Sequence, residues 1–401
     1  MTDESQSRRN LIFLTIGVFM VSMSLSEVTP FLSLYISSFG HYSKSALGFY
    51  SAVAYAASFF AMAISAPFWG KLADRSGRRL MLIRAALGMF IAFTLMGFAT
   101  NIWEMIVLRL FQGFFGGYVS NANALIAANT PKKTVGRAMG IIVTGSTSGS
   151  FLGPLLGGVF ASIFSLRDTF FVTGFGLFLV FLMTIFAIKE DFHPQEKETL
   201  PSAHVFFAQL PNRNLIFGLF ITTMIIQMVN LSINPIVSLY VKELMNNQGK
   251  IALMAGIVSA APGIATALTA PLFGRLGDRF GSEKMLISGF VFAFFVQLAT
   301  SFVGSISLLI LMRFLIGISD ATMLPSVNSL LTRNSSQAQV SRIFAYNQSF
   351  MSIGAMVGPL LGSLISGVFD YRGIFAAGAV LVLINLVINL FTQKKIIKPQ
   401  D

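Results

Sequence analysis

Long apolar stretches separated by short polar segments make up almost the whole chain. Twelve stretches reach the roughly 20 residues that a helix needs to cross the hydrocarbon core of a bilayer. A chain inside lipid must satisfy its backbone N–H and C=O groups within each segment, so each stretch is predicted to be a transmembrane α-helix. The stretches lie near residues 11–36, 46–69, 80–99, 103–129, 138–164, 168–188, 214–241, 251–273, 285–303, 306–331, 341–368 and 373–392.

The longest polar segment lies at the midpoint of the chain. Residues 189–213 carry charged residues and prolines and are predicted to be a cytoplasmic linker. This linker separates an N-terminal six-helix bundle, residues 1–188, from a C-terminal six-helix bundle, residues 214–401. The first apolar stretch is too long for the apolar core of a cleaved signal peptide, so we expect it to span the membrane.

Short sequences recur in the same order on both sides of this linker. PFLSLYI at 30–36 matches PIVSLYV at 235–241, and GPLLGG at 153–158 matches GPLLGS at 358–363, each pair 205 residues apart. The chain is therefore interpreted as a parallel repeat, and its fold class as an all-α integral membrane protein of two pseudo-symmetric six-helix bundles. Such a repeat places a substrate site between the halves near the membrane midplane.

Composition and charge agree with a membrane protein. Hydrophobic residues make up 54% of the chain and charged residues only 11%, against about 25% charged in soluble domains. The net charge of +12 does not indicate nucleic acid, because the 28 Lys and Arg residues are scattered between the apolar stretches. With both termini in the cytoplasm, 21 of them lie on the cytoplasmic side and five on the other, as the positive-inside rule requires.

A charged turn occurs in both halves between two apolar stretches. It reads GKLADRSGRR at 70–79 and GRLGDRFGSEK at 274–284. Glycine permits a tight turn and a close approach of helices, while a short aspartate suits pairing with a nearby arginine or capping a helix N-terminus. A conformational latch is favoured, and simple cytoplasmic anchoring by the arginines is the alternative. The predicted latch residues are Gly70, Asp74, Arg75, Gly77, Arg78, Asp278 and Arg279.

A glycine stripe marks the fifth apolar stretch. Glycine at every fourth position lines one helix face with hydrogen atoms, which lets a neighbouring helix pack closely. The proline in this stretch removes a backbone hydrogen bond and is expected to kink the helix. A generic packing face is the alternative to a functional motif. The residues concerned are Gly145, Gly149, Gly153, Pro154, Gly157 and Gly158.

Two acidic residues lie well inside apolar stretches, Glu27 in the first and Asp320 in the tenth. A carboxylate at the bilayer centre costs about 2.5–3.5 kcal/mol, so such a residue is a functional-site hypothesis by default. A buried carboxyl group can take up and release a proton, and in its ionised form it can attract a cation. Alternatively, Glu27 pairs with the intramembrane Arg109, and Asp320 bonds to backbone at a helix break near Gly317 and Pro325. By its chemistry alone, the Arg109 guanidinium could satisfy backbone carbonyls on adjacent helices.

A substrate pocket is inferred from polar side chains within the predicted helices. The 41 phenylalanines and 19 methionines suit an adaptable apolar pocket, although most of them are expected to face lipid. The candidate pocket residues are Gln112, Asn121, Asn123, Gln227, Asn230, Asn234, Asn328, Tyr346 and Asn347.

These motifs resemble those of the major facilitator superfamily. The family's Gly-x-Leu-Ala-Asp-Arg-x-Gly-Arg-Arg loop is matched from Gly70 to Arg79, and its Arg-x-x-Gln-Gly signature from Arg109 to Gly113. Within the superfamily, the chain resembles the twelve-helix drug:proton antiporters of the multidrug and quinolone efflux group, because the glycine stripe is similar to their antiporter signature. The resemblance implies a latch that closes the cytoplasmic side and a proton-tuning role for Arg109. The family usually has Pro-x-x-Pro in its first helix. In this chain the first proline is present as Pro30, and the second position is Ser33.

The sequence therefore predicts a proton-coupled antiporter that exports multiple amphipathic, often cationic, drugs by alternating access. It is not expected to be an enzyme or to need a cofactor or metal, because the proton gradient supplies the energy. We expect a monomer in the bacterial cytoplasmic (inner) membrane, with both termini cytoplasmic, that meets lipid, drugs and protons but no nucleic acid. The absence of a phosphate-binding loop in the sequence excludes an ATP-driven pump. A symporter of a small metabolite or sugar, a lipid or glycolipid flippase, and a non-transporting receptor are the alternatives.

Overall fold

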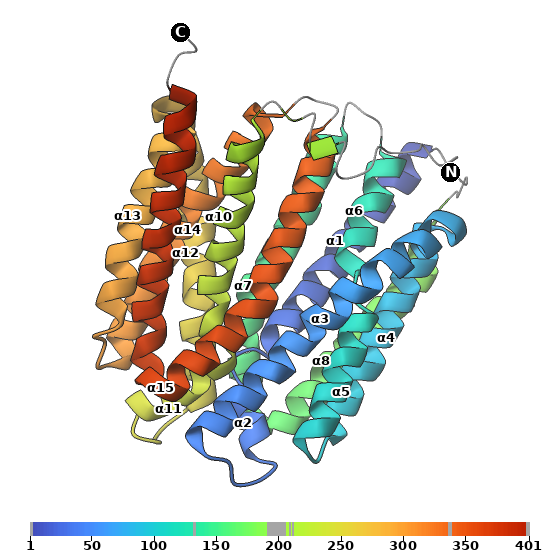
Figure 1. Cartoon of the computed structure of the whole chain (residues 1–401). Helices are drawn as coiled ribbons and strands as arrows, with labels where there is room; N and C mark the ends of the chain where they lie inside the picture. Colours follow the sequence, from blue (N-terminus) through green and yellow to red (C-terminus); the bar gives the residue numbers. More distant parts are fainter. Residues whose placement is uncertain are drawn as a thin grey trace. The chain divides into compact units, whose positions relative to one another are not determined.

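The computed structural model describes residues 3–130, 134–190, 206–207, 210, 212–335 and 339–397, and the regular structure in these residues is helical (Figure 1). The prediction of an all-α fold is therefore confirmed. The predicted linker, residues 189–213, falls largely outside the described residues.

The helices of the first half follow the apolar stretches predicted for it. They are α1 (Asp3–Glu27), α2 (Leu32–Ser37), α3 (Lys44–Ser76), α4 (Arg78–Phe98), α5 (Ile102–Phe114), α6 (Tyr118–Asn129), α7 (Val135–Ile163) and α8 (Leu166–Ala187). The second half repeats this order. It contains α10 (Arg213–Ser232), the 3₁₀ helix η1 (Asn234–Ile236), α11 (Val237–Leu244), α12 (Ile251–Phe280), α13 (Ser282–Thr300), α14 (Ile306–Arg333) and α15 (Val340–Ile397).

Several predicted segments are broken or joined in the structure. The first is divided into α1 and α2 at a turn that contains Pro30, which cannot donate a helical backbone hydrogen bond. The fourth is divided into α5 and α6 next to Gly117, whose φ of 103° glycine tolerates. The last two run together as α15, where Asp370 interrupts the helix with φ 62°.

Ten helical spans among the described residues are long and apolar enough to cross a membrane. This number counts α15 once and omits α5 and α6, because each of the two is too short alone. Dividing α15 at Asp370 and joining α5 with α6 would match the twelve predicted segments, and the exact count of membrane-spanning helices stays a prediction.

The described contacts divide the chain into two compact units. Unit 1 comprises residues 1–196 and 236–260, and unit 2 comprises residues 197–235 and 261–401. In unit 1, α1 packs on α7 and α4 on α8, around buried Leu14, Phe93 and Phe170. In unit 2, α10 packs along α15 and α13 along α14, around buried Phe220 and Phe290 (Figure 1). The predicted division into two six-helix bundles with boundaries at 188 and 214 stays a prediction.

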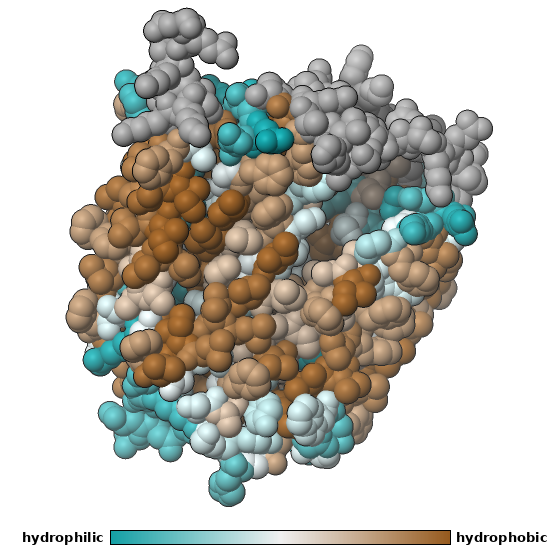
Figure 2. Space-filling model, in the orientation of Figure 1, coloured by the Kyte–Doolittle hydropathy of each residue, from teal (hydrophilic) through white to brown (hydrophobic). Residues whose placement is uncertain are grey.

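Large apolar side chains are exposed along the helices. Phe98, Phe186 and Phe302 are each well over half exposed. Figure 2 shows brown, apolar side chains over much of the face drawn, with teal, polar side chains towards its upper and lower edges. So many exposed phenylalanine side chains are unfavourable in water. They are favourable in contact with the hydrocarbon of a bilayer.

Candidate functional site

Glu27 is a fully buried carboxyl group without an ionic partner. It is the last residue of α1 and 0% exposed, and neither carboxyl oxygen lies within ordinary hydrogen-bond geometry of a donor in the described residues, although the Thr173 hydroxyl of α8 interacts with it. Arg109 on α5 is also buried, but its Nη1 donates to Gln112 Oε1 at 2.8 Å. The alternative in which Glu27 pairs with Arg109 is therefore wrong for this structure. Arg109 lies instead beside Gln112 and over the ring of Tyr55, 5.9 Å from its centre.

The glycine stripe of α7 packs along α1 and ends at Glu27. A Cβ at Gly145 would lie 2.9 Å from Thr15 Cγ2, and one at Gly153 would lie 3.0 Å from Ser26 Cβ. A Cβ at Gly157 would overlap the Glu27 carbonyl oxygen and lie 2.7 Å from its Cγ. The backbone of α1 therefore fits against α7 without intervening side chains, and this contact sets the position of Glu27.

The adjacent Gly158 faces a different helix. Its Cβ would lie 2.7 Å from the Ala252 carbonyl oxygen and 3.1 Å from Gly256 Cα on α12. Two successive glycines thus let α7 approach α1 on one side and α12 on the other. The helix α7 continues without interruption through Pro154.

The second half repeats this packing. A Cβ added at three glycines of α15 would collide with the backbone of α10. They are Gly354, Gly358 and Gly362. Each lies 205 residues after a glycine of the α7 stripe. Because Gly145 has Phe350 as its counterpart, the second stripe is one glycine shorter.

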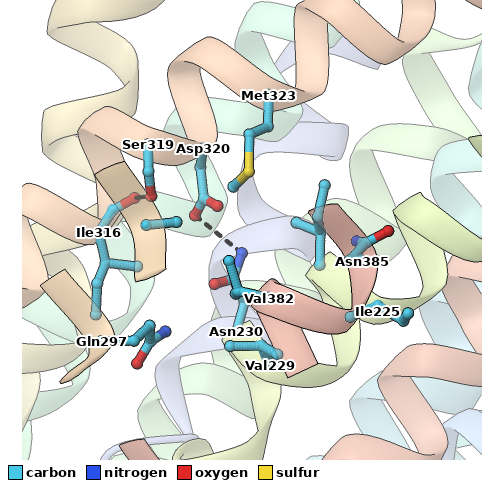
Figure 3. A pocket seen from close by; sticks show the side chains of 12 residues that line it. Ile225, Val229, Asn230, Gln297, Ile316, Ser319, Asp320, Met323, Val382 and Asn385 are labelled. Atoms are coloured by element: carbon cyan, nitrogen blue, oxygen red, sulfur yellow. Dashed lines mark hydrogen bonds between the residues drawn. The ribbon is translucent and has the colours of Figure 1, made fainter. Parts of the chain in front are cut away.

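Asp320 lies in a buried polar cluster of unit 2. It is 8% exposed on α14, and its Oδ2 accepts a hydrogen bond from Asn230 Nδ2 of α10 at 2.9 Å (Figure 3). The helix α14 continues through Gly317 and Pro325. The alternative of a backbone bond at a helix break is therefore wrong here, because the partner of Asp320 is a side chain of another helix.

Two residues of this cluster were missed by sequence reasoning. Gln297 of α13 and Asn385 of α15 line the cavity that Asp320 faces (Figure 3). Each is an amide inside an apolar stretch, which is the signal that pointed to Asn230. That signal gives no indication of which helices will meet.

The charged turn forms a compact junction between α3 and α4. Gly77 takes φ 90°, and Asp74 Oδ1 accepts from Arg78 Nη2 at 2.7 Å. The carboxyl group of Glu190 accepts the backbone N–H of Arg78 at 2.9 Å and that of Arg79 at 2.6 Å. Glu190 therefore caps the N-terminus of α4, where an anion is favoured. Sequence reasoning missed this residue, which lies more than a hundred positions away.

Gly70 does not make the close approach predicted for it. A Cβ there would meet nothing within 4 Å, because α3 continues past Gly70 to Ser76 and Gly77 alone makes the turn. The second copy repeats the turn with Gly281 at φ 93°. Beside it, the Arg279 guanidinium lies 5.5 Å from the Phe280 ring centre. Asp278 forms no ion pair among the described residues.

The predicted pocket residues make separate local contacts within their units. Asn121 donates to the Gly117 carbonyl oxygen at 2.8 Å, and Asn347 Oδ1 accepts from Thr223 Oγ1 at 2.7 Å. Tyr346 packs on Phe206 and Phe207. The remaining predicted residues Asn123, Gln227, Asn234 and Asn328 lie on α6, α10, η1 and α14, respectively.

A buried serine pair joins the repeated segments α2 and α11. Ser33 Oγ lies 2.7 Å from Ser238 Oγ, and both side chains are buried. Lys44 Nζ lies 2.7 Å from Glu243 Oε2 nearby, where both side chains are about half exposed. Ser33 takes the place of the second proline in the family's Pro-x-x-Pro pattern, and its hydroxyl forms a hydrogen bond that a proline could not form.

Fold, repeat and buried charges together define a membrane transporter of the major facilitator superfamily, to which the chain belongs. The Major Facilitator Superfamily sequence profile matches residues 14–249 and 215–399. Two curated proteins named "Multidrug resistance protein MdtG" are each 44% identical to it. The one from Escherichia fergusonii aligns over 98% of this chain and 96% of its own, and the one from Salmonella heidelberg over 95% and 94%.

Solved structures show the same fold at low sequence identity. A bacterial homologue of the human lysosomal transporter Spinster, in an inward-facing and unoccupied conformation, superposes with a TM-score of 0.79 at 15% identity over 97% of both chains. A mutant of the nucleoside transporter NupG superposes with a TM-score of 0.78 at 13% identity, over 96% of this chain and 99% of its own.

Proposed function

We propose that the protein is a proton-coupled antiporter that exports multiple amphipathic, often cationic, drugs by alternating access. The names of its 44% identical relatives support multidrug efflux. The observation that supports proton coupling is Glu27, a buried carboxyl group with no charged partner among the described residues. A carboxyl group in this position is costly to keep ionised, and therefore suits a site that is neutral with a proton bound and ionised when a cation replaces it.

Glu27 has a fixed position at the end of α1, where we propose that it exchanges a proton for a cation. It ends α1 at the break before α2, and the glycine stripe of α7 fixes its backbone. Proton and cationic drug then compete for one carboxylate, so drug binding releases the proton. This competition is the simplest physical basis for antiport. Arg109 and Gln112 form the second buried polar pair of this unit and are proposed to tune the exchange.

The other predicted roles belong to the same proposal. The charged turn acts as the cytoplasmic latch, with Asp74 paired to Arg78. The glycine stripe of α7 is the antiporter motif, because it lets α1 and α12 approach α7 closely. We propose the bacterial inner membrane as the location, with both termini cytoplasmic, a monomeric state, and the proton gradient as the energy source.

The test compares Glu27→Gln with Glu104→Gln in inside-out vesicles energised by a proton gradient. We expect Glu27→Gln to lower ethidium uptake at least about tenfold, because removing one partner of a desolvated charge pair costs about 2–5 kcal/mol. Glu104 is exposed at the start of α5, so Glu104→Gln controls for the loss of any one carboxylate and keeps wild-type uptake.

Two results would count against this function. The first is ethidium movement that does not respond to an imposed proton gradient in the wild type. The second is normal proton-driven uptake by Glu27→Gln at a normal membrane level. Movement of drug and proton in the same direction would favour the symporter instead.

A further inference from the structure

A small cavity lies between α10, α13, α14 and α15 of unit 2, with a mainly apolar lining and a few polar side chains. Its volume is about 10 Å³, close to the roughly 10–15 Å³ that one water molecule needs. Asp320, Asn230 and Gln297 face it beside apolar Ile316 and Val382 (Figure 3). Drug-sized pockets are about 300–1,000 Å³, so the cavity is far too small for an amphipathic drug.

Hydrogen-bonding groups around the cavity are left without partners. The side-chain amide of Gln297 is 4% exposed and forms no hydrogen bond within the described part of the chain. Asp320 Oδ2 accepts from Asn230, and the described residues give no partner to Asp320 Oδ1. Buried amides and carboxyl oxygens are almost always hydrogen-bonded, so these atoms indicate a small polar occupant.

On the α15 side of the cavity, the side chain of Asn385 already has hydrogen-bond partners. Asn385 Oδ1 accepts from Thr222 Oγ1 at 3.0 Å, and Asn385 Nδ2 donates to the Thr222 carbonyl oxygen at 3.2 Å. Asn389 Nδ2 donates to Thr222 Oγ1 at 2.7 Å, and all three side chains are fully buried. This network joins α10 to α15 and holds Asn385 in place. Asn389 Oδ1 has no partner among the described residues but does not line the cavity, so on the cavity wall Gln297 and Asp320 Oδ1 carry the unmet hydrogen bonds.

The charge balance of the site is simple. Arg313, two turns earlier on α14, is the charged group that acts on Asp320. The side chains that line the cavity from α10, α13 and α15 are neutral amides or apolar groups. Gain or loss of one proton by Asp320 therefore changes the net charge of this region by a full unit, beside a cavity too small to hold a drug.

We propose that this cavity holds one water molecule that bridges Gln297 to Asp320, and that Asp320 binds a coupling proton there, out of contact with the drug. A hydronium ion in the cavity gives its proton to Asp320 Oδ1 and leaves as its product the bridging water. In the reverse step the water takes the proton back and the carboxylate keeps its bond from Asn230. The proposal rests on the proton-coupled antiport inferred above and assigns different roles to its two carboxyl groups.

This assignment makes a charge test possible. A carboxylate that contacts the drug discriminates between cations and neutral molecules, whereas one that acts through the conformational equilibrium affects both alike. We expect Asp320→Asn to lower the proton-driven uptake of ethidium and of the uncharged dye Nile red by the same factor, within about threefold. Glu27→Gln is expected to impair ethidium about tenfold more than Nile red.

The water bridge is tested on purified protein by infrared difference spectroscopy between acid and neutral pH. The wild type should show a protonated-carboxyl band that Asp320→Asn lacks and that Gln297→Leu shifts. Gln297→Leu should also reproduce the transport loss of Asp320→Asn. Thr300→Val is the matched control, because Thr300 is a buried polar residue of α13 that does not line the cavity. It should keep both the band and the transport of the wild type.

Three results would overturn the proposal. A loss restricted to ethidium in Asp320→Asn would place the carboxylate in contact with the drug. Removal of the carboxyl band by Na⁺ would assign the cavity to a metal cation. An unshifted band in Gln297→Leu would exclude the bridge. If the wild type fails to transport under a proton gradient, the antiport proposal fails, while the infrared comparison still decides the state of the cavity.

Discussion

At the scale of single residues, Gly157 is the position where packing and proposed chemistry meet. It has no side chain, and the space that a Cβ would take is filled by the carbonyl oxygen and Cγ of Glu27. A buried carboxyl group without an ionic partner keeps a defined position only if its backbone is held firmly. The glycine therefore contributes to the site without offering it any functional group.

We predict that Gly157→Ala lowers both thermal stability and transport. The added methyl group collides with α1 and overpacks the contact, which costs about 1–3 kcal/mol. The midpoint of thermal unfolding in nanodiscs measures the first effect, and ethidium uptake measures the second.

Gly140→Ala supplies the control on the same helix. A Cβ at Gly140 meets nothing within 4 Å, so this variant should unfold at or slightly above the wild-type temperature, because alanine favours a helix over glycine. Equal behaviour of the two variants would show that the stripe tolerates side chains and does not position Glu27.

The residues found from the sequence are those that break a local pattern. Glu27 and Asp320 are acids inside apolar stretches, and the contact between α1 and α7 follows from glycine at every fourth position. The partners could not be predicted, since Gln297 and Glu190 act on groups that only the tertiary fold brings near. A polar residue in a predicted helix indicates that a contact exists, and does not say with which helix.

At the scale of elements, the short helices α2 and α11 form the contact most open to test. They are repeat mates, and the buried bond between Ser33 and Ser238 joins them. The orientation of the helices predicted from charge places both on the outer side of the membrane. Under the proposed alternating-access mechanism, this contact must open in each transport cycle.

We predict that the double variant Ser33→Cys with Ser238→Cys forms a disulfide that stops transport. The two Oγ atoms are 2.7 Å apart, so the β-carbons are close enough for a disulfide bond. The chain contains no cysteine of its own, so no background pairing arises. Oxidised vesicles should lose ethidium uptake, and a reducing agent should restore it.

Either single-cysteine variant serves as the control and should transport under both conditions. Full activity of the cross-linked double variant would mean that α2 and α11 stay together throughout the cycle. In that case the outer gate lies elsewhere.

At the scale of the whole molecule, the distribution of charge predicts how the chain crosses the membrane. The apolar stretches found in the sequence are helical over most of the described residues, because helices satisfy the backbone hydrogen bonds in lipid. The break at Asp370 falls between two predicted stretches, 341–368 and 373–392, whereas the break at Gly117 was not predicted. The break at Gly117 depends on a backbone angle that hydropathy does not register.

We predict opposite labelling of two single-cysteine variants in intact cells. Gln248→Cys lies in the exposed loop between α11 and α12 and should react with a membrane-impermeant maleimide. Gly136→Cys lies at the exposed start of α7, where a side chain meets open space, and should react only after the membrane is permeabilised. The reverse pattern would overturn the predicted orientation and the cytoplasmic location of both termini.

The serine bond between α2 and α11 also reflects the repeat in the sequence. A residue that contacts its own repeat mate lies next to the pseudo-two-fold axis, as in an isologous interface between identical subunits. Ser33 and Ser238 lie 205 residues apart at equivalent positions of the two repeats, and each supplies the same group to one shared bond. A substitution at either position therefore disrupts the same bond, and the contact stays symmetric only when both serines change together.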